Sequence, residues 1–269
     1  MRLLIFGAHP DDADYHAGRL AAIYRRPGRV VTMVSVTNGE AGHHERFGER
    51  LVAERRTEAA RAAAVIGADY RVWDFRDGRL EPTLDVRWDV VRTIRELRPD
   101  LVLSHRDNDY HPDHRATAHA VRDASYLITV PAIVPEAPIV DTVPVFGYLP
   151  DRFTRPTSLR ADVVIDVDDV LETIVSMLAC HESQFFEWLP ANRGILDEVP
   201  AGTEARLEWL RPWIAGSRKE AAERHRGALV EAYGDRRGAA VQHAEVFEIS
   251  EYGAPCDDDD RRRLFLLSE

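Results

Sequence analysis

The N-terminal part of the chain alternates short apolar runs with longer segments of helical character. The predicted strands are apolar or β-branched runs at residues 2–6, 30–36, 70–75 and 101–104. The predicted helices have the apolar spacing or the composition of helices and cover residues 17–24, 49–66 and 86–97. Alternation of strands and helices predicts an α/β fold, a Rossmann-like and mostly parallel sheet with helices on both faces.

The C-terminal part follows a less regular pattern. Five prolines between residues 130 and 151 predict loop and an edge strand. Further on, we expect strands at residues 161–165 and 241–249, a helix capped within residues 166–169 that runs towards residue 186, and another helix over residues 203–227. The acidic run 257–260 and the basic run 261–263 are typical of a solvated tail. Without an internal repeat or a linker, residues 1–269 are expected to form one domain with an elaborated C-terminal part.

Composition and charge narrow the class of protein. The chain has 269 residues, of which 45% are hydrophobic and 30% charged, so it can bury a sizeable core. A formal net charge of -11 disfavours a nucleic-acid partner and an anionic membrane surface. No apolar run reaches the roughly 20 residues that span a bilayer, and the first run is too short for a signal-peptide core. We therefore expect a cytoplasmic protein with no membrane span.

The two cysteines limit how a metal could be held. Cys180 and Cys256 lie far apart in the chain, which supports neither a disulfide framework nor a cysteine zinc site. Any metal must therefore be bound by histidine and carboxylate side chains.

Two clusters of histidine and aspartate follow predicted strands. One is His9-Pro10-Asp11-Asp12, and the other lies within residues 105–114 and includes His111-Pro112-Asp113-His114. Ligands of open α/β sheets bind at the carboxyl ends of the strands, and two imidazoles with one carboxylate are an ordinary catalytic zinc set. A lone histidine is more often a surface or capping residue, and one of two adjacent acids can be a helix cap. Neither explanation accounts for two clusters at the same edge of one sheet.

The motifs resemble those of the LmbE/PIG-L (GlcNAc-phosphatidylinositol de-N-acetylase) family of zinc-dependent N-deacetylases. The family's A-H-P-D-D-x-E motif has its counterpart in residues 8–14, with Asp14 where many members have Glu, and its H-x-D-H motif in residues 111–114. Weaker matches are residues 37–42, the Arg55-x-x-Glu58 helix and residues 181–184. The resemblance, and with it the catalytic motifs, lies within residues 1–184.

The resemblance implies a role for each residue of the two clusters. It assigns metal binding to His9, Asp12 and His114, with Zn²⁺ as the expected cofactor and another divalent metal as the alternative. It makes Asp11 the general base and His111 the general acid or electrophile. Asp113 is placed with the catalytic residues because its nearness to His111 in the sequence suggests a pair that raises the pKa of His111.

Three further residues are candidates for binding substrate, each with a plainer alternative. His43 lies in a loop with glycines and either contacts substrate or faces water. Arg55 either serves substrate or pairs with Glu58 one helical turn away. His181 either completes the pocket floor or is an ordinary core histidine.

By resemblance, the expected function is removal of an N-acetyl group from an amino sugar, a glycoside or a related small molecule. The alternatives are an amidase for a larger acyl amide, such as a thiol conjugate or natural-product intermediate, and a non-catalytic metal-binding module. A nucleotide-binding protein is disfavoured because residues 7–12 lack G-x-G-x-x-G and put two carboxylates where a phosphate needs amide donors. Homo-oligomerisation stays open.

Overall fold

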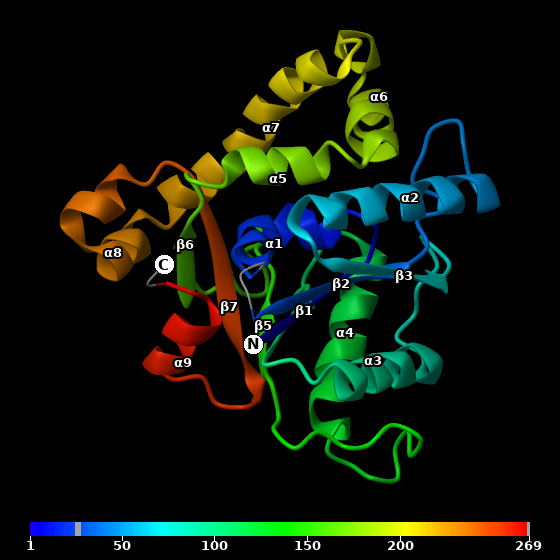
Figure 1. The fold of residues 1–269 in the computed structure, drawn as a ribbon, viewed down its shortest axis with the longest axis vertical. Coiled ribbons are helices and arrows are strands. Elements are labelled where there is room, and N and C mark those ends of the chain that lie inside the picture. Colours follow the sequence, from blue (N-terminus) through cyan, green and yellow to red (C-terminus); the bar gives the residue numbers. More distant parts are fainter. Residues whose placement is uncertain (25–27, 268–269) are drawn as a thin grey trace.

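A seven-stranded sheet forms the centre of a computed structural model that describes residues 1–24 and 28–267 (Figure 1). The strand order is β3-β2-β1-β4-β5-β7-β6. The first five strands in this order run parallel, and β7 is antiparallel to both of its neighbours. The bounds are β1 Arg2–Gly7, β2 Val30–Thr37, β3 Asp69–Phe75, β4 Leu101–Ser104, β5 Val145–Tyr148, β6 Val163–Asp166 and β7 Ala244–Gly253. The predicted mostly parallel α/β sheet is confirmed.

Helices cover both faces of the sheet because alternate residues of a strand point to opposite sides. In β1, Leu3 and Ile5 belong to the core cluster that includes α1 (Asp12–Ile23) and the end of α2 (Glu49–Ile66). Leu4 and Phe6 belong to the cluster on the other face, with α3 (Leu84–Leu97) and α4 (Pro112–Leu127). Figure 1 shows α1 and α2 on one side of the sheet and α3 and α4 on the other. Burial of strand residues on both faces explains why the strands read as continuous apolar runs.

The C-terminal part adds an outer layer beyond α1 and α2. It begins with α5 (Leu171–Leu178), a π-helical turn at Ser183–Trp188, α6 (Leu189–Arg193) and a short 3₁₀ turn at Leu196–Glu198. Helix α7 (Thr203–Arg224) continues the layer, α8 (Arg226–Ala240) packs against β6, and α9 (Asp258–Leu264) follows β7. Ile174 of α5, Phe185 of the π-turn and Ile214 of α7 share one apolar cluster that holds this layer together. Among the described residues, no helix is both long enough and apolar enough to cross a membrane.

Two expectations for the middle of the chain were wrong. The strand within the proline-rich stretch is not at an edge, because β7 returns antiparallel and pairs with β5, which leaves β6 at the edge. The acids 166–169 do not cap α5, whose N-cap is Val170 and has no side-chain hydrogen bond. Instead, the Asp168 carboxylate accepts hydrogen bonds from the backbone N–H groups of Gln242 and His243.

The end of the chain also differs from expectation. Helix α8 was not predicted, and the expected solvated tail at residues 257–263 contains most of helix α9. The Asp257 side chain accepts a 2.8 Å hydrogen bond from the backbone N–H of Asp260 and so caps α9. The apolar residues that follow the charged run, Leu264 and Phe265, are fully buried in the core cluster beside β1. The charged run is therefore the exposed side of a packed helix.

Candidate metal centre

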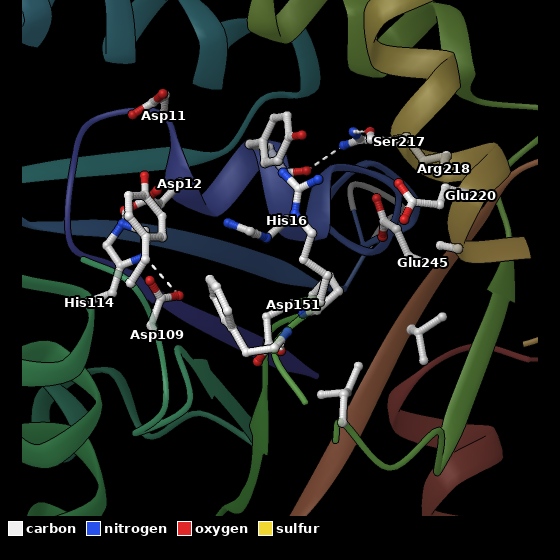
Figure 2. Close-up of a pocket in the computed structure, with 18 of the residues that line it drawn as sticks. Asp11, Asp12, His16, Asp109, His114, Asp151, Ser217, Arg218, Glu220 and Glu245 are labelled. Carbon is white, nitrogen blue, oxygen red and sulfur yellow. Dashed lines mark hydrogen bonds and ion pairs between the residues drawn. The ribbon is translucent and has the colours of Figure 1, made fainter. Parts of the chain in front are cut away.

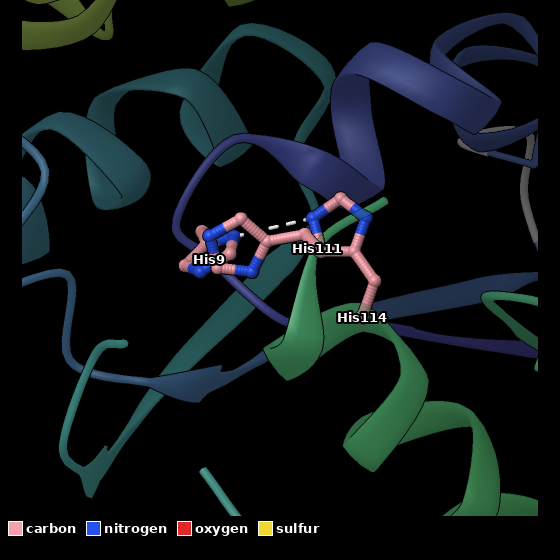
Figure 3. Close-up of side chains that lie close together, drawn as sticks. All are labelled: His9, His111 and His114. Atoms are coloured by element: carbon pink, nitrogen blue, oxygen red, sulfur yellow. Dashed lines mark hydrogen bonds between the residues drawn. The ribbon is translucent and has the colours of Figure 1, made fainter. Parts of the chain in front are cut away.

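The two histidine and aspartate clusters meet at the carboxyl edge of the sheet. His9 lies in the loop after β1, and Asp12 is the first residue of α1. His111 is the N-cap of α4, and His114 lies in its first turn, behind Pro112 at the start of the helix. Figure 3 shows the rings of His9, His111 and His114 grouped together. The structure thus brings together residues that are about a hundred positions apart in the chain.

The three expected metal ligands have the spacing of a single coordination shell. His9 Nδ1 lies 3.4 Å from Asp12 Oδ2, and His114 Nε2 lies 3.3 Å from His9 Nδ1 and 3.5 Å from Asp12 Oδ2. Two ligand atoms at zinc distances and a tetrahedral angle stand about 3.3 Å apart. All three separations match this value, so the residues fit one tetrahedral ion and leave its fourth position open.

Carboxylates face the ring nitrogens that the metal would leave free. His9 Nε2 lies 3.3 Å from Asp77 Oδ1 and 3.3 Å from Asp113 Oδ2, and His114 Nδ1 lies 3.1 Å from Asp109 Oδ2. Carboxylates in these places orient metal-binding histidines and raise their basicity. The surroundings of both histidines therefore also fit a metal site.

Backbone groups hold the Asp12 carboxylate in position. Its Oδ2 accepts hydrogen bonds from the backbone N–H groups of Ala8, at 2.9 Å, and His9, at 2.8 Å. Although burial alone would raise the pKa of Asp12, the neighbouring His114 and His105 lower it well below its usual value. Asp12 is consequently present as the carboxylate that a metal requires.

The expected pairing of Asp113 with His111 was wrong. Asp113 Oδ2 lies against His9 and accepts a 2.7 Å hydrogen bond from the backbone N–H of Gly78, while Oδ1 accepts one from Leu80 at 3.2 Å. Gly78 and Leu80 lie in the loop after β3, so Asp113 joins the first turn of α4 to that loop and to His9, one of the three expected metal ligands.

His111 has surroundings that favour its neutral form. Burial, with the positive charges of His9 and His114, lowers its pKa, whereas a raised pKa was expected. Its Nδ1 accepts a 3.2 Å hydrogen bond from the backbone N–H of Asp113. In this arrangement the ring proton is assigned to Nε2, which makes neutral His111 a hydrogen-bond donor through that atom.

Three other groups of described side chains near the site also have the spacing of metal ligands. They are His9, His111 and His114; Asp12, His105 and His114; and His9, Asp77 and Asp113. His105 Nε2 lies 3.3 Å from Asp12 Oδ2, but it also accepts the backbone N–H of Ala8 at 3.1 Å. His111 likewise uses Nδ1 for a backbone hydrogen bond. In the set of His9, Asp12 and His114, neither ligand nitrogen accepts a hydrogen bond from the described backbone, and the two backbone N–H groups that reach the set both go to the Asp12 carboxylate.

Asp11 differs from its neighbour Asp12 in its electrostatic surroundings. Only 8% of Asp11 is exposed, and burial together with the negative charge of Asp12 raises its pKa to about 6. His181, Arg55 and His9 act in the opposite direction. A carboxyl with a pKa near neutrality is suited to exchange a proton with a reacting group.

The three substrate-binding candidates contact other protein groups. His43 Nε2 is 2.9 Å from Glu187 Oε2. Arg55 is buried and donates to the carbonyl oxygen of Gly42 and to the side chain of Gln184, while Glu58 accepts hydrogen bonds from Ser183 instead of pairing with Arg55. His181 is fully buried, with Nε2 2.7 Å from Asp14 Oδ2. This contact gives Asp14 a partner that its sequence position did not reveal.

A cavity of about 330 Å³ opens from the metal centre towards the outer layer. Its inner end contains Asp11, Asp12, Asp109 and His114, which Figure 2 shows on one side of the pocket. Its far end is formed by α7 and β7, where Figure 2 labels Ser217, Arg218, Glu220 and Glu245. The C-terminal elements that follow the recognised motifs therefore form much of the pocket wall.

Three residues that contact the candidate metal ligands had no role predicted from the sequence. They are Asp77, His105 and Asp109. Asp77 and His105 follow predicted strands, and their position at the carboxyl edge was the signal that could have identified them. Asp109 lies within the second cluster, but only the folded loop shows that it faces His114.

The chain is similar to a family of de-N-acetylases and to individual known proteins. The family model described as PIG-L, GlcNAc-PI de-N-acetylase, matches residues 4–125. A 1D-myo-inositol 2-acetamido-2-deoxy-alpha-D-glucopyranoside deacetylase from Saccharopolyspora erythraea is 32% identical over 189 residues, which cover 60% of this chain and 68% of that protein. A 4-oxalmesaconate hydratase from Pseudomonas putida is 26% identical over 193 residues, covering 69% and 74%.

The solved structure of N,N'-diacetylchitobiose deacetylase from Pyrococcus horikoshii has a similar fold. It superposes with a TM-score of 0.71 at 20% identity, covering 93% of this chain and 83% of that one. The similarity of fold extends beyond residue 125, where the family model ends, and includes most of the outer layer.

Proposed function

This chain belongs to the PIG-L family of de-N-acetylases, and from this premise we propose that it removes the acetyl group from an N-acetylated amino sugar, its glycoside or a related small molecule. The observation that carries the proposal is the mutual spacing of 3.3 to 3.5 Å among His9 Nδ1, Asp12 Oδ2 and His114 Nε2. This spacing matches a tetrahedral ion with one open position, and a buried carboxyl with a raised pKa is adjacent in the chain.

The proposed mechanism divides the work among neighbouring side chains. His9, Asp12 and His114 hold the ion, while Asp77 and Asp113 orient His9 and Asp109 orients His114. We take the ion to be Zn²⁺ because two imidazoles and one carboxylate are its common catalytic ligands. When bound, a divalent metal lowers the pKa of water and polarises the amide carbonyl.

Asp11 and His111 handle the proton and the developing charge. The Asp11 carboxylate accepts a proton from the attacking water as the new C–O bond forms. His111 donates a hydrogen bond from Nε2 to the carbonyl oxygen as that oxygen gains negative charge, so it acts as the electrophile of the two roles expected for it. The C–N bond then breaks, and the proton held by Asp11 goes to the leaving amine. The products are acetate and a free amine.

Acetate release tests the proposal directly. Purified protein is incubated with N-acetylglucosamine, its methyl glycoside, N,N'-diacetylchitobiose and longer N-acyl analogues, and both acetate and free amine are measured. We expect release from at least one acetyl compound, loss of the activity after chelation, and recovery with one equivalent of Zn²⁺. Turnover that survives complete removal of metal, or cleavage of longer acyl groups only, would contradict the proposal.

Hydration of a carbon–carbon double bond is the second candidate. The Pseudomonas putida relative, named as a 4-oxalmesaconate hydratase, aligns with a longer share of this chain than the Saccharopolyspora erythraea deacetylase does. The same general base and activated water would serve addition to a polarised alkene. Loss of the conjugated ultraviolet absorbance of an unsaturated oxo acid, without any acetate from the acetyl compounds, would favour this candidate.

Beyond the site, we expect one domain over residues 1–269, a cytoplasmic location and a small-molecule substrate. The chain is either a monomer or a homo-oligomer. Light scattering of the purified protein and fractionation of the native cells test the oligomeric state and the location.

A further inference from the structure

The arginines that line the pocket differ in whether other groups of the protein engage their charge. Four arginines line the cavity: Arg152, Arg193, Arg218 and Arg224. Arg224 pairs with Glu220 at 2.6 Å. Arg218 is buried and donates to the carbonyl oxygen of Tyr15 and to Ser217 Oγ. These two arginines are engaged by the protein itself.

Arg152 and Arg193 are exposed and have no carboxylate partner among residues 1–24 and 28–267. The guanidinium of Arg193 lies over the Trp213 ring, 3.9 Å from its centroid. Both arginines line the cavity, so their positive charge is available to an anionic group of a ligand that binds there.

The acids of the outer wall are already neutralised. Asp151 accepts hydrogen bonds from Arg106 at 2.6 and 3.0 Å, and Glu220 is paired with Arg224. Glu245 accepts two backbone N–H groups of α1, and burial raises its pKa. The positive charge of Arg152 and Arg193 is therefore not cancelled within the wall.

A row of aromatic rings leads from the first helix to Arg193. Tyr15 lies in the first helix beside the metal site and stacks with Phe185 at 6.3 Å, and Phe185 contacts Trp213 edge-on at 6.3 Å. Arg193 lies on the far side of this row, over Trp213. All of these residues line the same cavity. A ligand whose amide reaches the metal centre can lie along these rings and extend a substituent to the arginines.

We propose that Arg152 and Arg193 form a subsite for an anionic substituent, a phosphate or a carboxylate, on the N-acetylated substrate. The inference rests on the proposed deacetylase function and narrows its substrate class to acidic compounds. Arginine is suited to this role because its planar guanidinium binds phosphate and carboxylate oxygens in pairs. The chain has a net charge of -11, so a local cationic pair is needed to attract an acidic substrate.

Binding of product-like amines tests the subsite without turnover. Calorimetry on the metal-loaded protein compares glucosamine with glucosamine 1-phosphate, glucosamine 6-phosphate and muramic acid, which separate phosphate from carboxylate. We expect at least one acidic amine to bind about 10-fold more tightly than glucosamine, the scale of a charge-assisted hydrogen bond. The preference should shrink as ionic strength rises.

Arginine variants locate the source of the preference. The double variant Arg152→Gln/Arg193→Gln should lose most of the preference, Arg193→Lys should keep part of it, and Arg236→Gln is the matched control on the exposed side of α8. Equal binding of all four amines would overturn the subsite. So would a preference that survives in the double variant, because the acid would then bind the metal or another surface.

Acetate release from the acetylated forms of the same compounds is measured in parallel. No acetate from any of them, with the binding preference intact, would refute the deacetylase function and leave the anion subsite standing. Acetate release without a preference for acidic compounds would support the deacetylase function and refute the anion subsite.

Discussion

Asp11 and Asp12 are adjacent in the chain, but their surroundings differ. Asp12 is fixed by two backbone N–H groups and faces two histidines, whereas burial and the charge of Asp12 raise the pKa of Asp11 to about 6. We predict that Asp11→Asn retains the metal and lowers kcat by about a hundredfold or more, the scale of a lost general base. Asp12→Ala should weaken metal binding itself. Elemental analysis and acetate release measure the two effects, and equal loss of metal in both variants would show that the division of roles is wrong.

His111 and His114 share the start of α4 but present different nitrogens to the site. His111 Nδ1 is held by a backbone N–H, while His114 Nε2 completes the set of three ligand atoms. We predict that His111→Ala keeps its metal and loses kcat. His114→Ala should lose more metal affinity than the roughly 10- to 100-fold typical of outer partners. Titration with a chromophoric chelator measures the metal affinity of both variants. An equally large loss of affinity in His111→Ala and His114→Ala would favour the set of three histidines instead.

At the scale of elements, helix α1 depends on a distant strand. Its backbone departs from helical geometry at Ala17 (φ -134°, ψ 31°), and beyond this kink the Glu245 carboxylate of β7 accepts the N–H groups of Arg19 at 2.9 Å and Leu20 at 3.3 Å. Glu245 therefore acts as a cap for the second half of α1.

We predict that Glu245→Ala lowers the free energy of unfolding by about 1–3 kcal/mol, because it leaves buried donors without acceptors. Glu245→Gln should cost less, since it keeps one acceptor oxygen. Chemical denaturation measures the change, with Glu251→Ala on the exposed end of the same strand as the control. A loss as large in the control would contradict the capping role.

The loop after β2 is attached to the π-turn through charged side chains. Glu187 contacts both His43 and Arg46. Burial alone would raise the pKa of Glu187, but these two hydrogen bonds outweigh burial and lower it. The pKa of His43 is lowered chiefly by burial. Both shifts make the folded state less stable as pH falls: His43 from about pH 6.5 downwards, and Glu187 from about pH 4.3 downwards.

We predict that Glu187→Gln flattens the stability profile below about pH 4.3, where Glu187 itself titrates, by less than about 1 kcal/mol, because a third of this side chain is exposed and the pairs are screened. Chemical denaturation of metal-free protein at a series of values from about pH 3.5 to about pH 7 measures the free energy of unfolding of the variant and of the parent. The same slope in parent and variant, or the same change in the exposed control Glu198→Gln, would contradict the assignment.

At the scale of the whole molecule, the end of the described chain completes the main core. Phe265 is fully buried against Phe247 of β7, with ring centroids 5.5 Å apart, and Tyr24 of the first helical segment donates to the carbonyl oxygen of Leu264 at 2.6 Å. We predict that Phe265→Ala lowers the free energy of unfolding by about 3–5 kcal/mol. Tyr252→Ala, at a half-exposed aromatic in β7, is the control for thermal denaturation. A small change at Phe265 would restore the solvated-tail interpretation.

Much of the central architecture followed from local patterns in the sequence. The helix over residues 49–66 and the strand over residues 101–104 have the predicted bounds, because helix formers and buried apolar runs act over a few neighbours. The two clusters could be placed at one edge because parallel strands end on the same side of a sheet. The resemblance to the family's motifs then predicted His9, Asp12 and His114 as the metal ligands, and the structure brings these three side chains together.

Only the tertiary structure decided what pairs across long distances. The interior position of β5 depends on its pairing with β7 about a hundred residues later, and no local signal in residues 145–148 specifies that partner. The partners of Asp113, Asp14 and Glu245 are likewise set by where other elements pack. The sequence determined which side chains can bind a metal and move protons, because that is a property of residue type. Their distances, burial and pKa values depend on the packed fold, because they arise from neighbours that are remote in the chain.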